Sequence, residues 1–175
     1  MRESFKFMLN HIPEGNINGV EVGVYKGDNA CEMLDNCDRL KLVLVDSYAA
    51  NDSWFTDERG MPFEEGKTEE FVQQVGERIS KYNGRAALMR MNSAFAAGKF
   101  PDKFFDYVYI DGGHDFKNIM IDLLSWLPKV REGGIFAGHD YGYKEVGDAV
   151  YSYIYSQRYD LYVNNSDWWI INKRG

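Results

Sequence analysis

Short apolar runs alternate with longer amphipathic stretches along most of the chain. The runs are rich in Val, Ile, Leu and Tyr, as buried strands usually are, and the stretches between them repeat apolar residues at helical spacing. This alternation predicts a parallel sheet with helices on both faces. The predicted strands are 19–24, 40–46, 85–90, 104–111 and 133–140, and the predicted helices are 28–37, 65–81, 93–99 and 115–129.

The pattern changes towards the C-terminal end of the chain. A helical stretch at 144–157 is followed by two strand-like runs, 159–165 and 167–173, which a short polar turn separates. Two strands so joined pair antiparallel. No repeat, low-complexity tract or linker interrupts the chain, so we expect a single α/β domain over residues 1–175. Its sheet would have seven strands, mostly parallel, with an antiparallel C-terminal strand.

Residues 47–64 interrupt the regular order with a long polar and aromatic segment directly after the second predicted strand. Long segments of this kind in compact domains are often functional lids. Trp54 and Phe55 favour the interpretation that this segment is a lid which covers a substrate site, because exposed aromatic side chains usually have something to cover. A surface insertion without function is the alternative.

Composition and charge exclude several classes of partner. The 175 residues are 45% hydrophobic and carry a formal net charge of -7, without the cluster of Lys and Arg that nucleic acid requires. Cys31 and Cys37 lie six apart on a predicted helix and so face different ways, which fits a reducing compartment. We expect no leader, because the first residues lack a charged-then-apolar pattern, and no apolar run approaches the roughly 20 residues that span a membrane. We expect a cytoplasmic protein with no membrane partner.

Polar side chains stand at the carboxyl ends of the predicted strands. In open α/β sheets the ligand lies beyond these ends, near the point where the strand order reverses. One such residue often marks only the exit of the chain into solvent, but five strand ends agree here. The residues are Glu21, Asp46, Asn92, Ser93, Asp111, His114, His139 and Asp140.

The first strand runs into a glycine turn, "VEVGVYKG", at residues 20–27. Tyr25 stands where a dinucleotide motif has a glycine, and its side chain would obstruct a pyrophosphate. Asp46 follows Gly27 by 19 residues, the distance at which a carboxylate meets a ribose diol. An S-adenosyl ligand has the ribose and no phosphate, and Glu21 or Asp111 could accept hydrogen bonds from its ammonium group. A nicotinamide-dependent oxidoreductase is the alternative on the same fold.

Three segments carry a resemblance to a known family: "VEVGVYKGDNA", "LVLVDSY", and residues 106–142 with their "IDGGH" and "GGIFAGHD". The chain resembles class I S-adenosylmethionine-dependent methyltransferases, and most of all the metal-dependent small-molecule O-methyltransferases of the catechol and macrocin types. The resemblance implies a Rossmann-like methyltransferase fold and methyl transfer to a hydroxyl of a small molecule or sugar. It implies that S-adenosylmethionine is bound by Glu21, Gly23, Tyr25, Gly27, Asp46, Ser47, Asn92, Ser93 and Asp111.

The resemblance also implies a metal and a base. Asp111, His139 and Asp140 fall on positions that ligate a divalent ion, Mg or Mn, in metal-dependent relatives. His139 departs from the acidic or amide residue usual there, which favours manganese or makes His139 a structural histidine. His114 follows Asp111 by three residues, at the spacing of the relatives' catalytic base, and Asp111 would assist it. A surface role for His114 is the alternative, and Asp115 reads as the N-cap of the next helix.

A non-catalytic binding or assembly subunit is a further alternative, because only about 18 residues precede the first predicted strand. The relatives usually have helices there that shape the acceptor pocket. In this chain the 47–64 segment or a second subunit would have to complete the pocket, so a homo-oligomer is possible. The methyl acceptor is a small molecule that the sequence does not identify.

Overall fold

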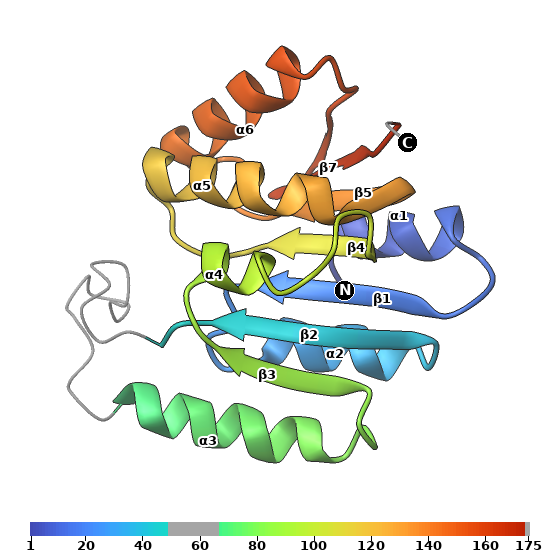
Figure 1. The fold of residues 1–175 in the computed structure, drawn as a ribbon, viewed down its shortest axis with the longest axis vertical. Coiled ribbons are helices and arrows are strands. Elements are labelled where there is room, and N and C mark those ends of the chain that lie inside the picture. The colour runs from blue at the N-terminus through green and yellow to red at the C-terminus, as the bar shows by residue number, and fades with distance from the viewer. Residues whose placement is uncertain (49–66, 174–175) are drawn as a thin grey trace.

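The computed structural model describes residues 1–48 and 67–173, and it places seven strands of these ranges in one sheet (Figure 1). The strand order is β3-β2-β1-β4-β5-β7-β6, and only β7 runs against its neighbours. The predicted Rossmann-like fold class is therefore confirmed. The strands are β1 (Ile17–Val22), β2 (Leu40–Asp46), β3 (Ala86–Arg90), β4 (Phe105–Ile110), β5 (Val130–Gly138), β6 (Tyr162–Asn164) and β7 (Asp167–Ile171).

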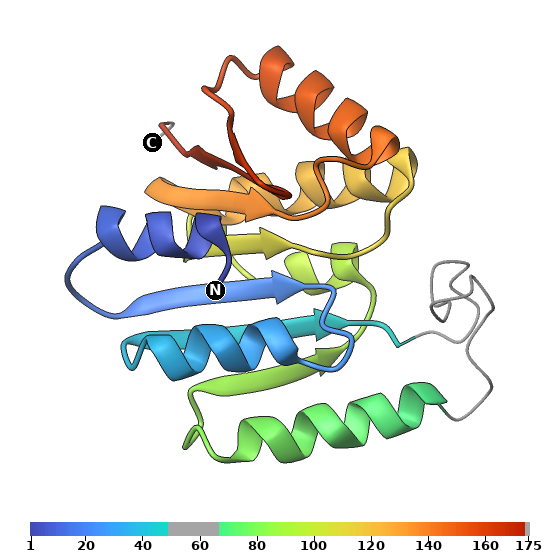
Figure 2. The ribbon, with the colours of Figure 1, turned by 180° about the vertical axis from the view of Figure 1, so that it is seen from behind.

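Helices cover both faces of the sheet, and each face has its own hydrophobic core (Figures 1 and 2). Helices α1, α2 and α3 pack on one face, and α4, α5 and α6 pack on the other. Trp168 and Trp169, adjacent on β7, point into opposite cores because successive strand residues face opposite sides. The helices are α1 (Glu3–His11), α2 (Asp28–Asn36), α3 (Lys67–Ser80), α4 (Ser93–Ala97), α5 (Phe116–Trp126) and α6 (Lys144–Ser156).

The main departure from the predicted elements is helix α1, which the sequence pattern did not indicate. Its nine residues bury only Ser4, Phe5 and Met8, too few for a clear helical period. Helix α5 ends at Trp126, and a short 3-10 turn containing Pro128 continues to Lys129, because proline disrupts a regular helix. The proposed lid, 47–64, lies outside the described residues from position 49 onward. No helix in the described ranges is long and apolar enough to cross a membrane.

A buried polar cluster fixes the first turn of α1 against the sheet, and we call it the α1 anchor: Ser4, Tyr107, Tyr109 and Asp167. Ser4 donates from both its backbone N and its Oγ to Asp167 Oδ2, at 2.9 Å each. Tyr109 donates its hydroxyl to Asp167 Oδ1 at 3.0 Å, and the Ser4 and Tyr107 hydroxyls lie 3.0 Å apart. Asp167 begins the antiparallel strand, so the anchor holds α1 at the carboxyl edge of the parallel strands.

Replacement of Ser4 by alanine is expected to lower the free energy of unfolding by about 2 kcal/mol, because a buried carboxylate and a buried tyrosine each lose a partner. The matched control is Ser156→Ala. Its exposed hydroxyl donates to the Tyr153 carbonyl of its own helix and accepts a long contact from Gln157, so its effect should stay within about 0.5 kcal/mol. Urea unfolding of both variants measures the difference, and equal effects would contradict a stabilising α1 anchor.

Candidate active site

A cavity of about 650 Å³ opens at the carboxyl ends of the parallel strands, which is a volume typical of small-ligand sites. The predicted site residues line it, except Gly27. The structure therefore gathers side chains from five strand ends that are far apart in sequence, as the strand-end pattern predicted. The lining includes Glu21, Gly23, Tyr25, Asp46, Ser47, Asn92, Ser93, Asp111, His114, His139 and Asp140.

The glycine turn requires its first glycine. Gly23 has φ +89°, and a Cβ at this position would lie 2.2 Å from the Asp111 carbonyl oxygen, so no side chain fits. Gly27, with φ +76°, precedes α2 and packs near Val75 of α3, so the structure places it in the turn and not on the cavity wall. Tyr25 is 43% exposed and its ring packs edge-on against Phe71 at 4.9 Å, so it lies beside the cavity and outside the core.

Glu21 and Asn29 form a buried polar pair in the cavity wall. Asn29 Nδ2 donates to Glu21 Oε1 at 2.8 Å. Glu21 Oε2 and Asn29 Oδ1 are both buried, and the described residues give neither atom a hydrogen-bond partner. Burial raises the pKa of Glu21 to about 8. Two buried acceptors without partners are costly unless a ligand satisfies them. The sequence analysis missed Asn29, whose position in the first turn of α2 carries no distinctive signal.

Asp46 holds the glycine turn in place. Its Oδ2 accepts hydrogen bonds from the backbone N of Val24 at 2.8 Å and of Tyr25 at 3.0 Å, and its Oδ1 accepts from the backbone N of Tyr48 at 2.9 Å. A carboxylate offers about four acceptor positions. Three are used by the backbone, which leaves capacity for one hydroxyl of a ribose. Asp46 therefore has a structural role in addition to the one that the sequence predicted.

Ser93 and Asn92 are also tied into the protein. Asn92 Oδ1 accepts from the backbone N of Ala94 at 3.0 Å and caps α4. Ser93 Oγ accepts from Trp126 Nε1 at 2.7 Å and donates to Asp122 Oδ1. Burial raises the pKa of Asp122 to about 6. The sequence analysis missed Asp122, although an acid between Ile119 and Trp126 on the apolar face of a helix was a signal.

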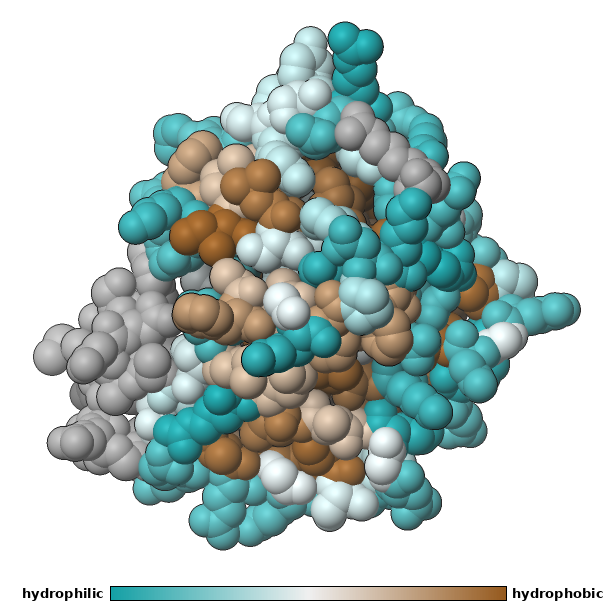
Figure 3. Space-filling model, in the orientation of Figure 1, coloured by the Kyte–Doolittle hydropathy of each residue, from teal (hydrophilic) through white to brown (hydrophobic). Residues whose placement is uncertain are grey.

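The side of the molecule around α4 and α5 is apolar. Figure 3 shows hydrophobic side chains over these two helices, and the exposed large ones on them are Phe95, Phe116, Ile121 and Leu124. Ile121 also lines the cavity, next to Asp122. The cavity wall near Ser93 and Asp122 thus combines an apolar surface with a buried carboxyl group, which suits a flat heterocycle that has hydrogen-bond donors.

Replacement of Asp122 by asparagine is expected to make stability less sensitive to pH. The pKa of Asp122 rises from 3.8 to about 6 on folding, so the unfolded chain releases this proton first and wild-type stability falls as pH rises from about 4 to about 6. Asparagine keeps the acceptor for Ser93 and does not titrate. The variant should therefore gain about 2 kcal/mol on the wild type between pH 4 and pH 7.

Urea unfolding at pH 4 and pH 7 measures this gain. Asp148→Asn is the control, because that exposed carboxylate pairs with Lys144 on the surface of α6. Parallel pH profiles of the wild type and the Asp122 variant would contradict the buried, shifted carboxyl group.

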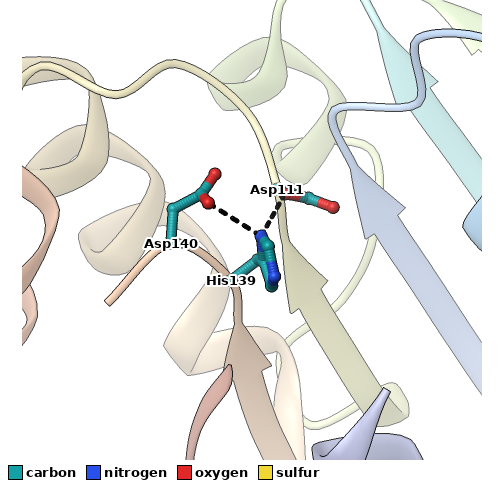
Figure 4. A group of neighbouring side chains, drawn as sticks. All are labelled: Asp111, His139 and Asp140. Atoms are coloured by element: carbon teal, nitrogen blue, oxygen red, sulfur yellow. Dashed lines mark ion pairs between the residues drawn. The ribbon is translucent and has the colours of Figure 1, made fainter. Parts of the chain in front are cut away.

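Asp111, His139 and Asp140 come together at the ends of β4 and β5 (Figure 4), and we call them the carboxylate-histidine trio. His139 Nδ1 lies 2.9 Å from Asp140 Oδ1 and 3.7 Å from Asp111 Oδ1. One ligand atom from each residue lies within 4.8 Å of the others. Burial raises the pKa of Asp111 to about 6. Two carboxylates and an imidazole at this spacing are suitable donors for a divalent ion.

His114 joins the trio through Asp140. Its Nε2 lies 2.5 Å from Asp140 Oδ2, and this hydrogen bond raises the pKa of His114 above its ordinary value. The ring is partly exposed in the cavity, next to Tyr143. Asp115 Oδ1 accepts from the backbone N of Asn118 at 2.9 Å, which confirms the predicted N-cap of α5. His114 therefore has the arrangement of a general base that a carboxylate orients.

Arg2, the residue that precedes α1, contacts two members of the trio. Its NH2 lies 3.3 Å from Asp111 Oδ2, and its NH1 is hydrogen-bonded to His139 Nε2. The sequence analysis missed this residue, because nothing in the local sequence near the start of the chain indicates contact with residues more than 100 positions away.

Comparison with known proteins agrees with the fold. Residues 20–141 match the family model described as a methyltransferase domain, and no curated protein sequence matches. Among solved structures, one provisionally assigned as a caffeoyl-CoA O-methyltransferase from Staphylococcus aureus has a TM-score of 0.66 and 14% identity, over 98% of this chain and 84% of that chain. The calicheamicin methyltransferase CalS11 has a TM-score of 0.67 and 12% identity, over 96% of this chain and 77% of that chain. The O-methyltransferase NovP has a TM-score of 0.64 and 16% identity, over 98% of this chain and 79% of that chain. At these identities the likeness shows the fold.

Proposed function

We propose, from the premise that the chain belongs to the methyltransferase-domain family matched by residues 20–141, that it transfers a methyl group from S-adenosylmethionine to a hydroxyl oxygen of a small molecule. One observation carries the proposal. A single cavity has two unpartnered buried acceptors, Glu21 Oε2 and Asn29 Oδ1, in one part of its wall, and the His114 and Asp140 pair in another.

The glycine-turn side of the cavity fits the methyl donor. The ammonium group of S-adenosylmethionine has three N–H donors, and Glu21 Oε2 and Asn29 Oδ1 are acceptors that need donors. The carboxylates of Asp46 and Asp111 line this wall and favour a cationic ligand over a pyrophosphate. The site therefore favours the S-adenosyl ligand over the nicotinamide alternative.

The other end of the cavity supplies a base for the acceptor. With His114 Nε2 donating to Asp140, His114 Nδ1 is the nitrogen that takes the proton of the acceptor hydroxyl. As the proton leaves, the oxygen forms a bond to the methyl carbon, the bond between carbon and sulfur breaks, and sulfur keeps the electron pair as a neutral thioether. Asp140 stabilises the imidazolium that His114 becomes.

We propose the carboxylate-histidine trio as the ligands of a divalent ion. Its donor set fits, because carboxylate oxygens suit Mg and Mn, and the imidazole of His139 favours Mn. When bound, the ion would polarise the acceptor hydroxyl and make its proton easier to remove. The residues of the chain would do the rest: the trio orients the acceptor, and His114 holds the proton.

Calorimetry and a transfer assay test the proposal. We expect S-adenosylmethionine to bind at least 100-fold more tightly than NADH, and a labelled methyl group to appear on a hydroxyl among a panel of sugars, catechols and other diols. Equal affinity for NADH would overturn the proposal. Tight binding of S-adenosylmethionine without transfer to any acceptor would instead favour the non-catalytic binding subunit.

A further inference from the structure

We infer that Arg2 is an internal cation that competes with a divalent ion for the carboxylate-histidine trio. The inference rests on the metal ligands proposed above and assigns a role to a residue outside the segment that matches the family. Arg2 is the cationic side chain that the structure places against two of the three ligands, Asp111 and His139.

The hydrogen bonds of Arg2 determine which ring nitrogen of His139 carries a proton. A guanidinium has donors and no acceptor, so the contact from Arg2 NH1 requires a lone pair on His139 Nε2. The proton of the neutral ring then lies on Nδ1, which donates to Asp140 Oδ1 at 2.9 Å. In this arrangement both nitrogens of His139 are engaged, and neither offers a lone pair to a metal.

The charges lead to the same conclusion. Arg2 NH2 lies 3.3 Å from Asp111 Oδ2, so the guanidinium already neutralises part of the negative charge that would attract an ion. An ion held by all three ligands would lie close to a guanidinium bonded to two of them, in a partly buried site. Like charges at such separation repel strongly. Metal binding therefore requires the Arg2 side chain to move away.

The α1 anchor places Arg2 at the trio. Ser4, two residues further along the chain, is fully buried and donates twice to Asp167. Tyr109, which also donates to Asp167, lies on β4 two residues before Asp111, so one strand carries part of both the anchor and the trio. The backbone at Arg2 is thus close to a fixed point, whereas its side chain is partly exposed and can rotate out of the site.

The test compares the Mn²⁺ affinity of the chelator-treated wild type with that of R2Q, R2K and K6Q. Lys6 lies on α1 and pairs with half-buried Glu3, so K6Q removes the same charge away from the trio. Isothermal titration with Mn²⁺, with free Mn²⁺ followed by electron paramagnetic resonance, gives the affinities. We expect R2Q to bind at least ten-fold more tightly than the wild type, K6Q within two-fold of it, and R2K in between, because an ammonium keeps the charge but not the planar fork.

Circular dichroism establishes whether each variant is folded. If R2Q does not fold, the Mn²⁺ affinity of R2K is compared with that of the wild type instead. The double variant R2Q with D111N should lose the gain, and a gain that persists would overturn the inference. Equal Mn²⁺ binding by R2Q and the wild type would overturn the role of Arg2 and leave the metal ligands standing. If neither protein bound Mn²⁺, the metal proposal and this inference would both fail. Binding of S-adenosylmethionine, measured in the same samples, would test the proposed methyl donor independently of the metal.

Discussion

Replacement of His114 by alanine should lower the rate of methyl transfer at least about 100-fold, the usual contribution of a positioned base, and leave the affinity for S-adenosylmethionine unchanged. The reason is the separation of roles in the cavity. His114 pairs with Asp140 at the acceptor end, whereas Glu21 and Asn29 at the glycine-turn side offer acceptors to the donor. The measurement is the rate at saturating acceptor, with the donor affinity determined by calorimetry.

His11→Ala is the matched control for His114, because the exposed ring of His11 stacks on Phe7 on α1, outside the cavity. Its rate should equal that of the wild type. Asp140→Asn should also reduce the rate, by a smaller factor, since the imidazole remains but loses the charge that stabilises its protonated form. A wild-type rate in both His114→Ala and Asp140→Asn would refute the assignment of the base.

Replacement of Glu21 by glutamine should have opposite effects on ligand binding and on stability. Binding of S-adenosylmethionine should weaken about 100-fold, because glutamine cannot ionise to pair with the ammonium as the buried carboxyl group can. Stability of the protein without ligand should rise. Burial lifts the pKa of Glu21 from 4.5 to about 8, so between these pH values the unfolded chain has released the proton that the folded chain still holds. Wild-type stability therefore falls as pH rises through this range.

Glutamine does not titrate, so at pH 8 the variant should be more stable than the wild type by about 4 kcal/mol, and near pH 4.5 the two should differ little. Urea unfolding at pH 5 and pH 8, with calorimetry for the ligand, measures both effects. Glu32→Gln is the control, because Glu32 is an exposed residue of α2 whose carboxylate pairs with the N-terminal ammonium and lies outside the cavity wall. Binding of the ligand by Glu21→Gln as tight as that of the wild type would contradict the role of Glu21 in holding the ammonium group.

The elements that the sequence predicted well are those with strong periodicity. Strand β2 has the predicted bounds, and the predicted antiparallel pairing of β6 and β7 is found, because buried strands must be continuously apolar and tight turns have a small choice of residues. Helix α1 escaped prediction because its stability depends on Asp167, which lies more than 160 positions away, and not on its own apolar pattern.

The residues of the candidate site also fall into a group that the sequence predicted and a group that it did not. The strand-end residues were predictable because parallel strands deliver their carboxyl ends to one edge of the sheet. Arg2, Asn29 and Asp122 were missed because they approach that edge from helices or from the chain preceding them, and only the packing of these elements decides which side chains reach the cavity. The binding of a ribose by Asp46 stays a prediction. Its hydrogen bond to the backbone of the glycine turn was not predicted from the sequence and is seen in the structure.

The contact of Gly23 with Asp111 has a consequence for re-engineering the enzyme. A Cβ on Gly23 would lie 2.2 Å from the Asp111 carbonyl oxygen, so the glycine turn, which we propose as the binding segment for the methyl donor, and the segment that leads to His114 touch through bare backbone. They behave as one block with no side chain between them to absorb an adjustment. Segments grafted from relatives to change the acceptor must therefore preserve the backbone path at 111–112, or exchange both segments together.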